Sequence, residues 1–142
     1  MPLKMTLRYL ILFTLSVLLL SCRKDNESPI STGTAEWKDA PVVSSQSGNT
    51  VIQIQGVQGI KWNARITEGA AWCSFSLANS IPEKDGVLTE GINALYVYFS
   101  ENTDKEDRKA SISIQIGEGT PISLVLTQSG KISGTDAETD AK

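Results

Sequence analysis

The feature that most constrains the fold is a run of alternating apolar and polar residues between Leu95 and Gln128. Segment 110–116 reads Ala-Ser-Ile-Ser-Ile-Gln-Ile, and segments 95–99 and 122–128 follow the same period of two. This period places every second side chain on one face of a β-strand. The expected buried face holds Ile112, Ile114, Ile116, Leu124 and Leu126, and the expected wet face holds Ser111, Ser113, Gln115, Ser123 and Thr127. A second layer of structure must cover the apolar face.

The preceding residues supply that second layer as further short strands. Strands are predicted at 50–55, 61–67 and 71–77, and Trp37 to Ser44 can form a first one, which Pro41 confines to a sheet edge or a bulge. A long loop runs from Ala78 to Asn93, within which Val87-Leu88 can form a short strand. No helical period interrupts this pattern. The sequence therefore predicts an all-β fold, an immunoglobulin-like β-sandwich of about seven strands.

The N-terminus has a different character. Lys4 and Arg8 precede an almost wholly apolar stretch from Tyr9 to Leu20, which has the length of a signal-peptide core and falls short of the roughly 20 residues of a spanning helix. The last two residues of this stretch are followed by Ser21 and Cys22, and the resulting sequence Leu-Leu-Ser-Cys at 19–22 resembles the lipobox of bacterial lipoproteins. In such signals cleavage precedes the cysteine, whose thiol then carries lipid. We expect a signal peptide at 1–21 and lipid on Cys22, with an uncleaved anchor helix as the alternative.

The domain boundaries follow from composition. Residues 22–36 are rich in Ser, Thr, Gly, Asn and Asp and are predicted to form a flexible tether. The sandwich is expected at 37–130, and 131–142 is expected to be a disordered tail. Lys-Asp-Asn-Glu at 24–27 resembles in part the acidic export tag of surface-exposed lipoproteins in Bacteroidetes, with a solvated linker as the alternative. The expected location is the outer membrane, lipid-anchored and facing outward.

Composition argues against several functions. The 142 residues carry a net charge of only −3 and no basic run, so we expect no nucleic-acid binding. The absence of His removes the commonest general base and metal ligand. Most acids lie in two polar loops among Lys and Arg, which suggests solvated charge rather than the paired carboxylates of a glycosidase. A Ca²⁺ site at Asp104, Glu106 and Asp107 is a minor alternative, because Lys105 and Arg108 interleave with these acids. We expect no enzyme activity, metal or cofactor.

The remaining cysteine and one tryptophan are expected to pack in the core. If Cys22 carries lipid, Cys73 has no partner, and its apolar surroundings suggest a small buried hydrophobe. Trp62 lies on an apolar-patterned strand and is assigned to the core, whereas Ser74 and Ser76 share a face with Trp72 and taken alone suggest that its ring is exposed. Trp37 sits at the edge of the domain and stays undecided.

Tyr96 and Tyr98 are the candidate binding residues. They share one face of strand 95–99, whose other face carries Leu95, Val97 and Phe99. From the strand rise, their rings should lie about 7 Å apart. Flat exposed rings with a hydroxyl group can stack on sugar faces. The alternative is that tyrosine simply favours a strand's solvent face.

Several residues together resemble a known family. They are Trp62-Asn63-Ala64, Trp72, Gly86, Asn102-Thr103, Arg108 and the closing Thr127-Gln128-Ser129-Gly130. This set resembles the BACON domain, an immunoglobulin-like module common in Bacteroidetes surface proteins, over about Val42 to Gly130. The chain departs from the family at Cys73, where an aliphatic residue is usual, and in its longer 78–93 loop. The match of Trp72 to the family's second tryptophan implies a buried packing role for this residue. The resemblance also implies a non-catalytic surface module that binds glycan or mucin. The alternative is a structural or protein-interaction module, a spacer or subunit of a surface complex.

Overall fold

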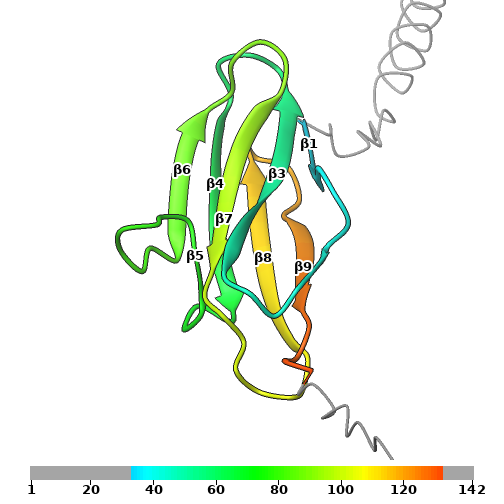
Figure 1. Ribbon diagram of the computed structural model, residues 1–142. Helices are drawn as coiled ribbons and strands as arrows, with labels where there is room; N and C mark the ends of the chain where they lie inside the picture. The colour runs from blue at the N-terminus through cyan, green and yellow to red at the C-terminus, as the bar shows by residue number, and fades with distance from the viewer. Residues whose placement is uncertain (1–32, 133–142) are drawn as a thin grey trace, which may run out of the picture.

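The computed structural model describes residues 33–132, which form two β-sheets packed face to face (Figure 1). The first sheet has the order β1-β3-β7-β5, namely Gly33–Trp37, Gly48–Gly56, Asn93–Phe99 and Cys73–Ser74. The second has the order β2-β9-β8-β4-β6, namely Val42–Val43, Ile122–Gln128, Arg108–Ile116, Lys61–Glu68 and Glu83–Val87. The all-β sandwich is therefore confirmed, with nine strands in this part of the chain rather than about seven. These residues include no helix that could cross a membrane.

The core lies between the sheets and follows the alternation of the sequence. On β8 and β9 the side chains of Ile112, Ile114 and Leu126 are fully buried, and on β7 so are Leu95 and Val97. Ile116 and Trp62 are buried as predicted, whereas Leu124 is only half-buried, in the part of β9 that forms the edge of the sheet because β2 pairs only with Thr127 and Gln128. The expected wet face is drier than predicted, since Ser111, Ser113, Gln115 and Thr127 are half-buried and only Ser123 is exposed.

The first strands differ from the prediction. β1 begins at Gly33, inside the predicted 22–36 tether, and buries Ala35 opposite Ile54 of β3. The sequence pattern does not reveal this strand, because three of its five residues, Gly33, Thr34 and Glu36, are of types that are common in turns and linkers. The strand predicted at 37–44 is divided between the sheets: Trp37 ends β1, and β2 joins β9 in parallel. Pro41 lies just before this edge, where its carbonyl accepts a hydrogen bond from the Thr127 amide at 2.8 Å. Residues 1–32, with the predicted signal and Cys22, and 133–142 lie outside the described residues.

The region from Ala71 to Asn93 also differs. Only Cys73–Ser74 of the predicted 71–77 strand is a strand, and Leu77 is 83% exposed instead of facing the core. The cause is local, since the Phe75 amide donates to the Ile81 carbonyl at 2.9 Å and closes a short loop. Within the predicted 78–93 loop, β6 occupies Glu83–Val87 and pairs with β4. Gly86 lies opposite Trp62, and a Cβ there would come within 2.7 Å of the indole ring.

The two ends of the first sheet are set by its register. Gly33, at the start of β1, pairs with Gly56 at the end of β3. Gly48, at the start of β3, pairs with Phe99 at the end of β7. The chain therefore enters the sandwich at one end, and the end of β7 with the segment that follows it lies at the other (Figure 1).

Truncating a core isoleucine tests this packing. Ile114 is fully buried, so Ile114→Ala should lower the free energy of unfolding by about 2–5 kcal/mol. Ser123→Ala, on exposed β9 surface, is the matched control and should change it by less than about 0.5 kcal/mol. Chemical denaturation measures both, and equal effects would contradict the assigned faces.

Candidate functional site

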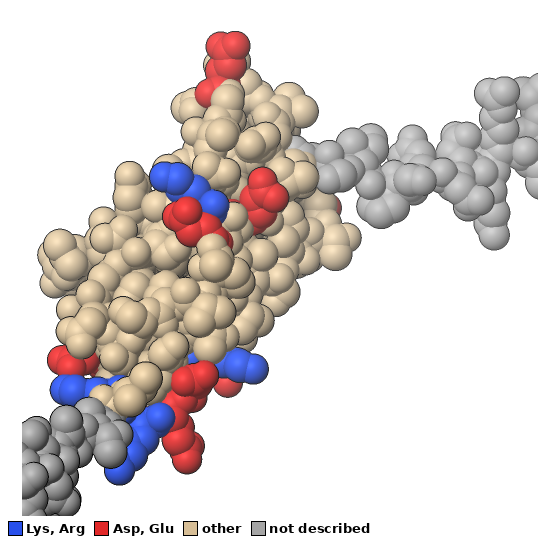
Figure 2. All heavy atoms as spheres, turned by 45° about the vertical axis from the view of Figure 1, so that its right-hand side comes forward, with Lys and Arg blue, Asp and Glu red and all other residues tan. Residues whose placement is uncertain are grey.

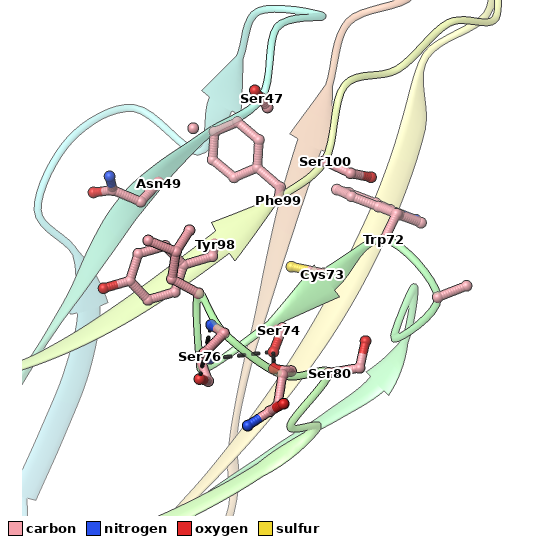
Figure 3. A pocket seen from close by; sticks show the side chains of 15 residues that line it. Ser47, Asn49, Trp72, Cys73, Ser74, Ser76, Ser80, Tyr98, Phe99 and Ser100 are labelled. Atoms are coloured by element: carbon pink, nitrogen blue, oxygen red, sulfur yellow. Dashed lines mark hydrogen bonds between the residues drawn. The ribbon is translucent and has the colours of Figure 1, made fainter.

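An open hollow of about 510 Å³ lies at the β5 edge of the first sheet (Figure 3). Its walls come from the start of β3, the end of β7, and β5 with the residues on either side of it. This volume falls within the range of about 300–1,000 Å³ that is usual for small-molecule sites. The hollow was not predicted, because its walls are brought together only by the folded sheet.

The lining of the hollow is polar, aromatic and uncharged. Its polar side chains are five serines and two asparagines: Ser47, Asn49, Ser74, Ser76, Asn79, Ser80 and Ser100. Its aromatic side chains are Trp72, Tyr98 and Phe99, and no Lys, Arg, Asp or Glu is among the fifteen lining residues. Hydroxyl and amide groups of this kind donate and accept hydrogen bonds without requiring an ion.

The Ser74 hydroxyl fixes the shape of one wall. Its Oγ accepts hydrogen bonds from the amides of Ile81 at 2.8 Å and Ser76 at 3.1 Å, and donates to the Asn79 carbonyl at 2.9 Å. This is the local side chain to backbone bonding typical of serine in turns. By contrast, the side chains of Asn49 and Ser80 make no hydrogen bond to other described residues, so their polar groups are available to a ligand.

The two tyrosines predicted as binding residues lie side by side. Their ring centroids are 6.3 Å apart with an interplanar angle of 21°, close to the 7 Å expected from strand geometry. Tyr98 is half-buried in the hollow, between Asn49 of β3 and Ser74 of β5 across the sheet. Tyr96 is 47% exposed and continues the aromatic surface beyond the lining of the hollow. The structure thus brings the pair together, and their binding role stays a prediction.

Trp72 is partly buried rather than a full member of the core, and one side of its ring is covered. The Arg108 guanidinium carbon lies 4.4 Å from the centroid of the indole ring, which is a cation–π contact. Arg108 Nη2 donates to the carbonyls of Ser100 at 2.9 Å and Glu101 at 3.0 Å. Burial lowers the pKa of the Arg108 guanidinium, which nevertheless stays protonated at neutral pH. Trp72 is therefore held as a fixed wall of the hollow.

Behind this wall lies a buried glutamine. Gln128 is fully buried, and its Oε1 accepts from Arg108 Nε at 2.9 Å. Its Nε2 donates to the carbonyls of Gln46 at 3.1 Å and Ser100 at 3.0 Å, and more weakly to that of Ser45 at 3.3 Å. Gln128 therefore joins the segments on which both the β3 and β7 walls of the hollow depend.

A buried asparagine binds the backbone in the connection between β7 and β8. Asn102 is fully buried, and its Nδ2 donates to the carbonyls of Glu106 at 2.9 Å and Ser129 at 3.1 Å. Gly130 packs so closely against the Lys105 carbonyl that a Cβ would collide with it. The Asn-then-Arg connection and the closing Thr-Gln-Ser-Gly, singled out in the sequence, therefore have structural roles here.

Cys73 and the other two tryptophans pack as structural residues. Cys73 is a free, buried thiol, and burial raises its pKa from 9.0 to about 11, so it is neutral at physiological pH and a poor nucleophile. Trp62 is buried in the core as predicted. Trp37, which the sequence left undecided, is half-buried against the core with an Nε1 that has no hydrogen-bond partner within the described chain.

The arrangement of the described acids bears on whether they could hold a metal ion. Residues 33–132 contain no set of three or more Cys, Asp or Glu placed to hold a metal ion. Asp107, one of the candidate Ca²⁺ ligands, instead accepts a hydrogen bond from the Gly130 amide at 2.9 Å. The ion pairs in this part of the chain are Arg65–Glu83 at 2.8 Å and Lys131–Glu101 at 3.1 Å, both on the surface.

Comparison with known proteins finds similarity in fold. No family model matches the chain, and no curated protein matches it. Among solved structures, the chain is similar to a Bacteroides ovatus GH5 xyloglucanase in complex with a XXXG heptasaccharide, with a TM-score of 0.51 and 18% identity. That match covers 69% of this chain and 19% of the xyloglucanase chain. An NMR structure of a protein from Bacteroides thetaiotaomicron matches over 78% of this chain and 97% of its own, with a TM-score of 0.45 and 9% identity. At such identities the likeness concerns the fold alone.

Replacing Gln128 tests whether its buried hydrogen bonds hold the walls of the hollow in place. Gln128→Leu keeps the approximate volume but removes the acceptor of Arg108 Nε and the donor to the Gln46 carbonyl, while the Ser100 carbonyl keeps its bond from Arg108 Nη2. We expect the free energy of unfolding to fall by about 1–3 kcal/mol, with a larger loss if several groups stay unpaired. The Trp72 environment should change as well, which tryptophan fluorescence reports. Gln53→Leu, half-buried on β3 away from the hollow, is the matched control.

Proposed function

We propose that this chain is a non-catalytic surface module with a BACON-like domain, and that it binds glycan at the hollow beside Tyr98. One observation carries the proposal: a concave site lined by seven hydroxyl- or amide-bearing side chains and three aromatic ones, without a charge. Sugars present hydroxyl groups at their edges and apolar C–H groups on their faces. The polar side chains suit the first, and the exposed tyrosine rings suit the second.

The absence of carboxylates from the lining supports the non-catalytic part of the proposal. Glycoside hydrolysis by the common mechanism requires two carboxyl groups on opposite sides of the scissile bond. None lines the hollow, and the acids in the described ion pairs are more than one-third exposed. The similarity to part of a xyloglucanase supports the fold, and the glycan proposal rests on the hollow itself.

A protein-interaction role is the second candidate, and Leu77 favours it. This side chain is 83% exposed at the rim of the hollow, where an apolar contact to a partner protein could form. A single exposed leucine is ordinary on a protein surface, so it weighs less than the lining of the hollow. Leu77→Ser separates the two functions, since it should abolish an apolar protein contact but weaken glycan binding less than Tyr98→Ala does.

The cellular location of the chain is part of the same proposal. Lipid on Cys22 would anchor the chain to the outer membrane, with the residues before Gly33 as the tether and the domain facing outward. This proposal rests on the apolar stretch and the Leu-Leu-Ser-Cys sequence at 19–22. The membrane partner is then the bilayer itself, reached through the lipid.

Substitution of the tyrosines tests the binding site. Affinity electrophoresis of residues 23–142 in gels containing soluble polysaccharides should show retardation by at least one of them. Tyr98→Ala should weaken that binding about tenfold, which corresponds to about 1.4 kcal/mol, and adding Tyr96→Ala should weaken it further. Tyr98→Phe keeps the ring and should keep most of the binding, and Val87→Ala on β6 is the surface control. Undiminished binding by the folded double variant would move the site away from the tyrosines.

Cell fractionation tests the anchor. Cys22→Ala removes the thiol that would carry lipid, so the variant should leave the outer-membrane fraction while wild type stays there. Metabolic labelling with a fatty-acid analogue should mark wild type and not the variant. Cys73→Ala is the control, because its thiol is buried in the domain and should not affect either readout. A fatty-acid label that persists on the Cys22→Ala chain would rule out lipid on this cysteine.

A further inference from the structure

We infer that the hollow selects neutral glycans and rejects sialylated, sulfated or uronic-acid-containing ones. This inference rests on the proposed glycan binding and adds the chemical class of the ligand. It follows from the charges in and around the hollow rather than from its shape. The lining offers hydroxyl, amide and aromatic groups and no cation.

The Arg108 guanidinium, which contacts lining residues of the hollow, already binds other groups of the protein. Arg108 contacts Trp72, which lines the hollow, but Arg108 itself is not a lining residue. Its Nε donates to Gln128, and its Nη2 donates to the carbonyls of Ser100 and Glu101. Nε and Nη2 are therefore occupied and one face of the guanidinium lies against the Trp72 ring, so an anionic sugar could use these groups only by displacing the present hydrogen bonds. Since they hold the wall of the hollow, their loss would disturb the site itself.

The described domain as a whole carries no excess of positive charge. Lys131 is paired with Glu101 at 3.1 Å, next to the lining residue Ser100. Residues 33–132 contain eleven acids and eight bases, a net charge of −3. On the face that Figure 2 shows, Lys and Arg lie beside Asp and Glu, and no broad area of positive charge is seen. An acidic glycan therefore approaches a weakly negative domain.

The energetic consequence is a difference between glycan classes. A carboxylate or sulfate that enters the hollow loses water and gains no opposite charge, which is costly. A neutral sugar exchanges water for the hydroxyl and amide groups of the wall and loses much less. Selection of this kind comes from penalising the wrong ligand as well as from attracting the right one.

Matched pairs of glycans test the inference. Affinity electrophoresis should compare neutral polysaccharides, such as a β-glucan and a galactomannan, with polygalacturonate, a sulfated galactan and sialylated mucin glycans. Wild type should be retarded by at least one neutral glycan and at least tenfold less by the acidic ones. Retardation should change little between low and high salt, because no ion pair forms.

Adding a positive charge to the hollow tests whether the hollow itself selects against acidic glycans. Ser80 is exposed in the wall of the hollow, so Ser80→Lys should gain measurable retardation by an acidic glycan. Thr120→Lys adds the same charge in the exposed β8–β9 hairpin outside the hollow and should not. Equal gains in both variants would overturn the assignment of selection to the hollow.

The outcomes separate the inference from the proposed function. Strong, salt-sensitive retardation of wild type by acidic glycans, abolished by Tyr98→Ala, would overturn the inference and leave glycan binding intact. No retardation by either class would overturn the proposed function and the inference with it. Retardation by neutral glycans alone, with the expected gain in Ser80→Lys, supports both.

Discussion

The hydrogen bonds of the Gln128 amide are the interaction on which the end of the sandwich depends. One side chain binds Arg108 through its oxygen and the backbone of the 45–46 and Ser100 segments through its nitrogen. Gln128 is wholly buried, so its own amide depends on these partners, and it supplies the acceptor for Arg108 Nε. Arg108 in turn fixes Trp72, and Ser100 continues the strand that carries both tyrosines. The geometry of the hollow is thus a consequence of a polar network behind it rather than of apolar packing alone.

The strands with a regular alternation could be predicted from the sequence, and the irregular ones could not. β4, β8 and β9 appear close to their expected bounds because a half-buried strand leaves a period of two. β1 carries Gly, Thr and Glu, whose preference for linkers outweighed one buried alanine. Leu77 lies outside the core because the Ser74 hydroxyl turns the chain, a side-chain effect that periodicity does not record.

The site was predictable to a smaller extent. Tyr96 and Tyr98 could be placed together because a strand fixes the spacing of alternate residues, and the measured 6.3 Å agrees with that reasoning. The serines and asparagines of the hollow come from separate segments, and their proximity depends on the order of strands in the sheet. Arg108 and Gln128 belong to the motifs singled out in the sequence, but only their contacts in the structure reveal that they support the wall of the hollow.

The register of β3 gives the domain a direction. Gly33 pairs with one end of this strand, and the hollow includes residues at its other end. Eight steps of extended chain separate Gly48 from Gly56, a span of roughly 27 Å. Whatever precedes Gly33 therefore joins the sandwich at the pole opposite the hollow. If that upstream segment is fixed to a surface, the sandwich acts as a stalk of this length, and its ligand is met at the distal tip.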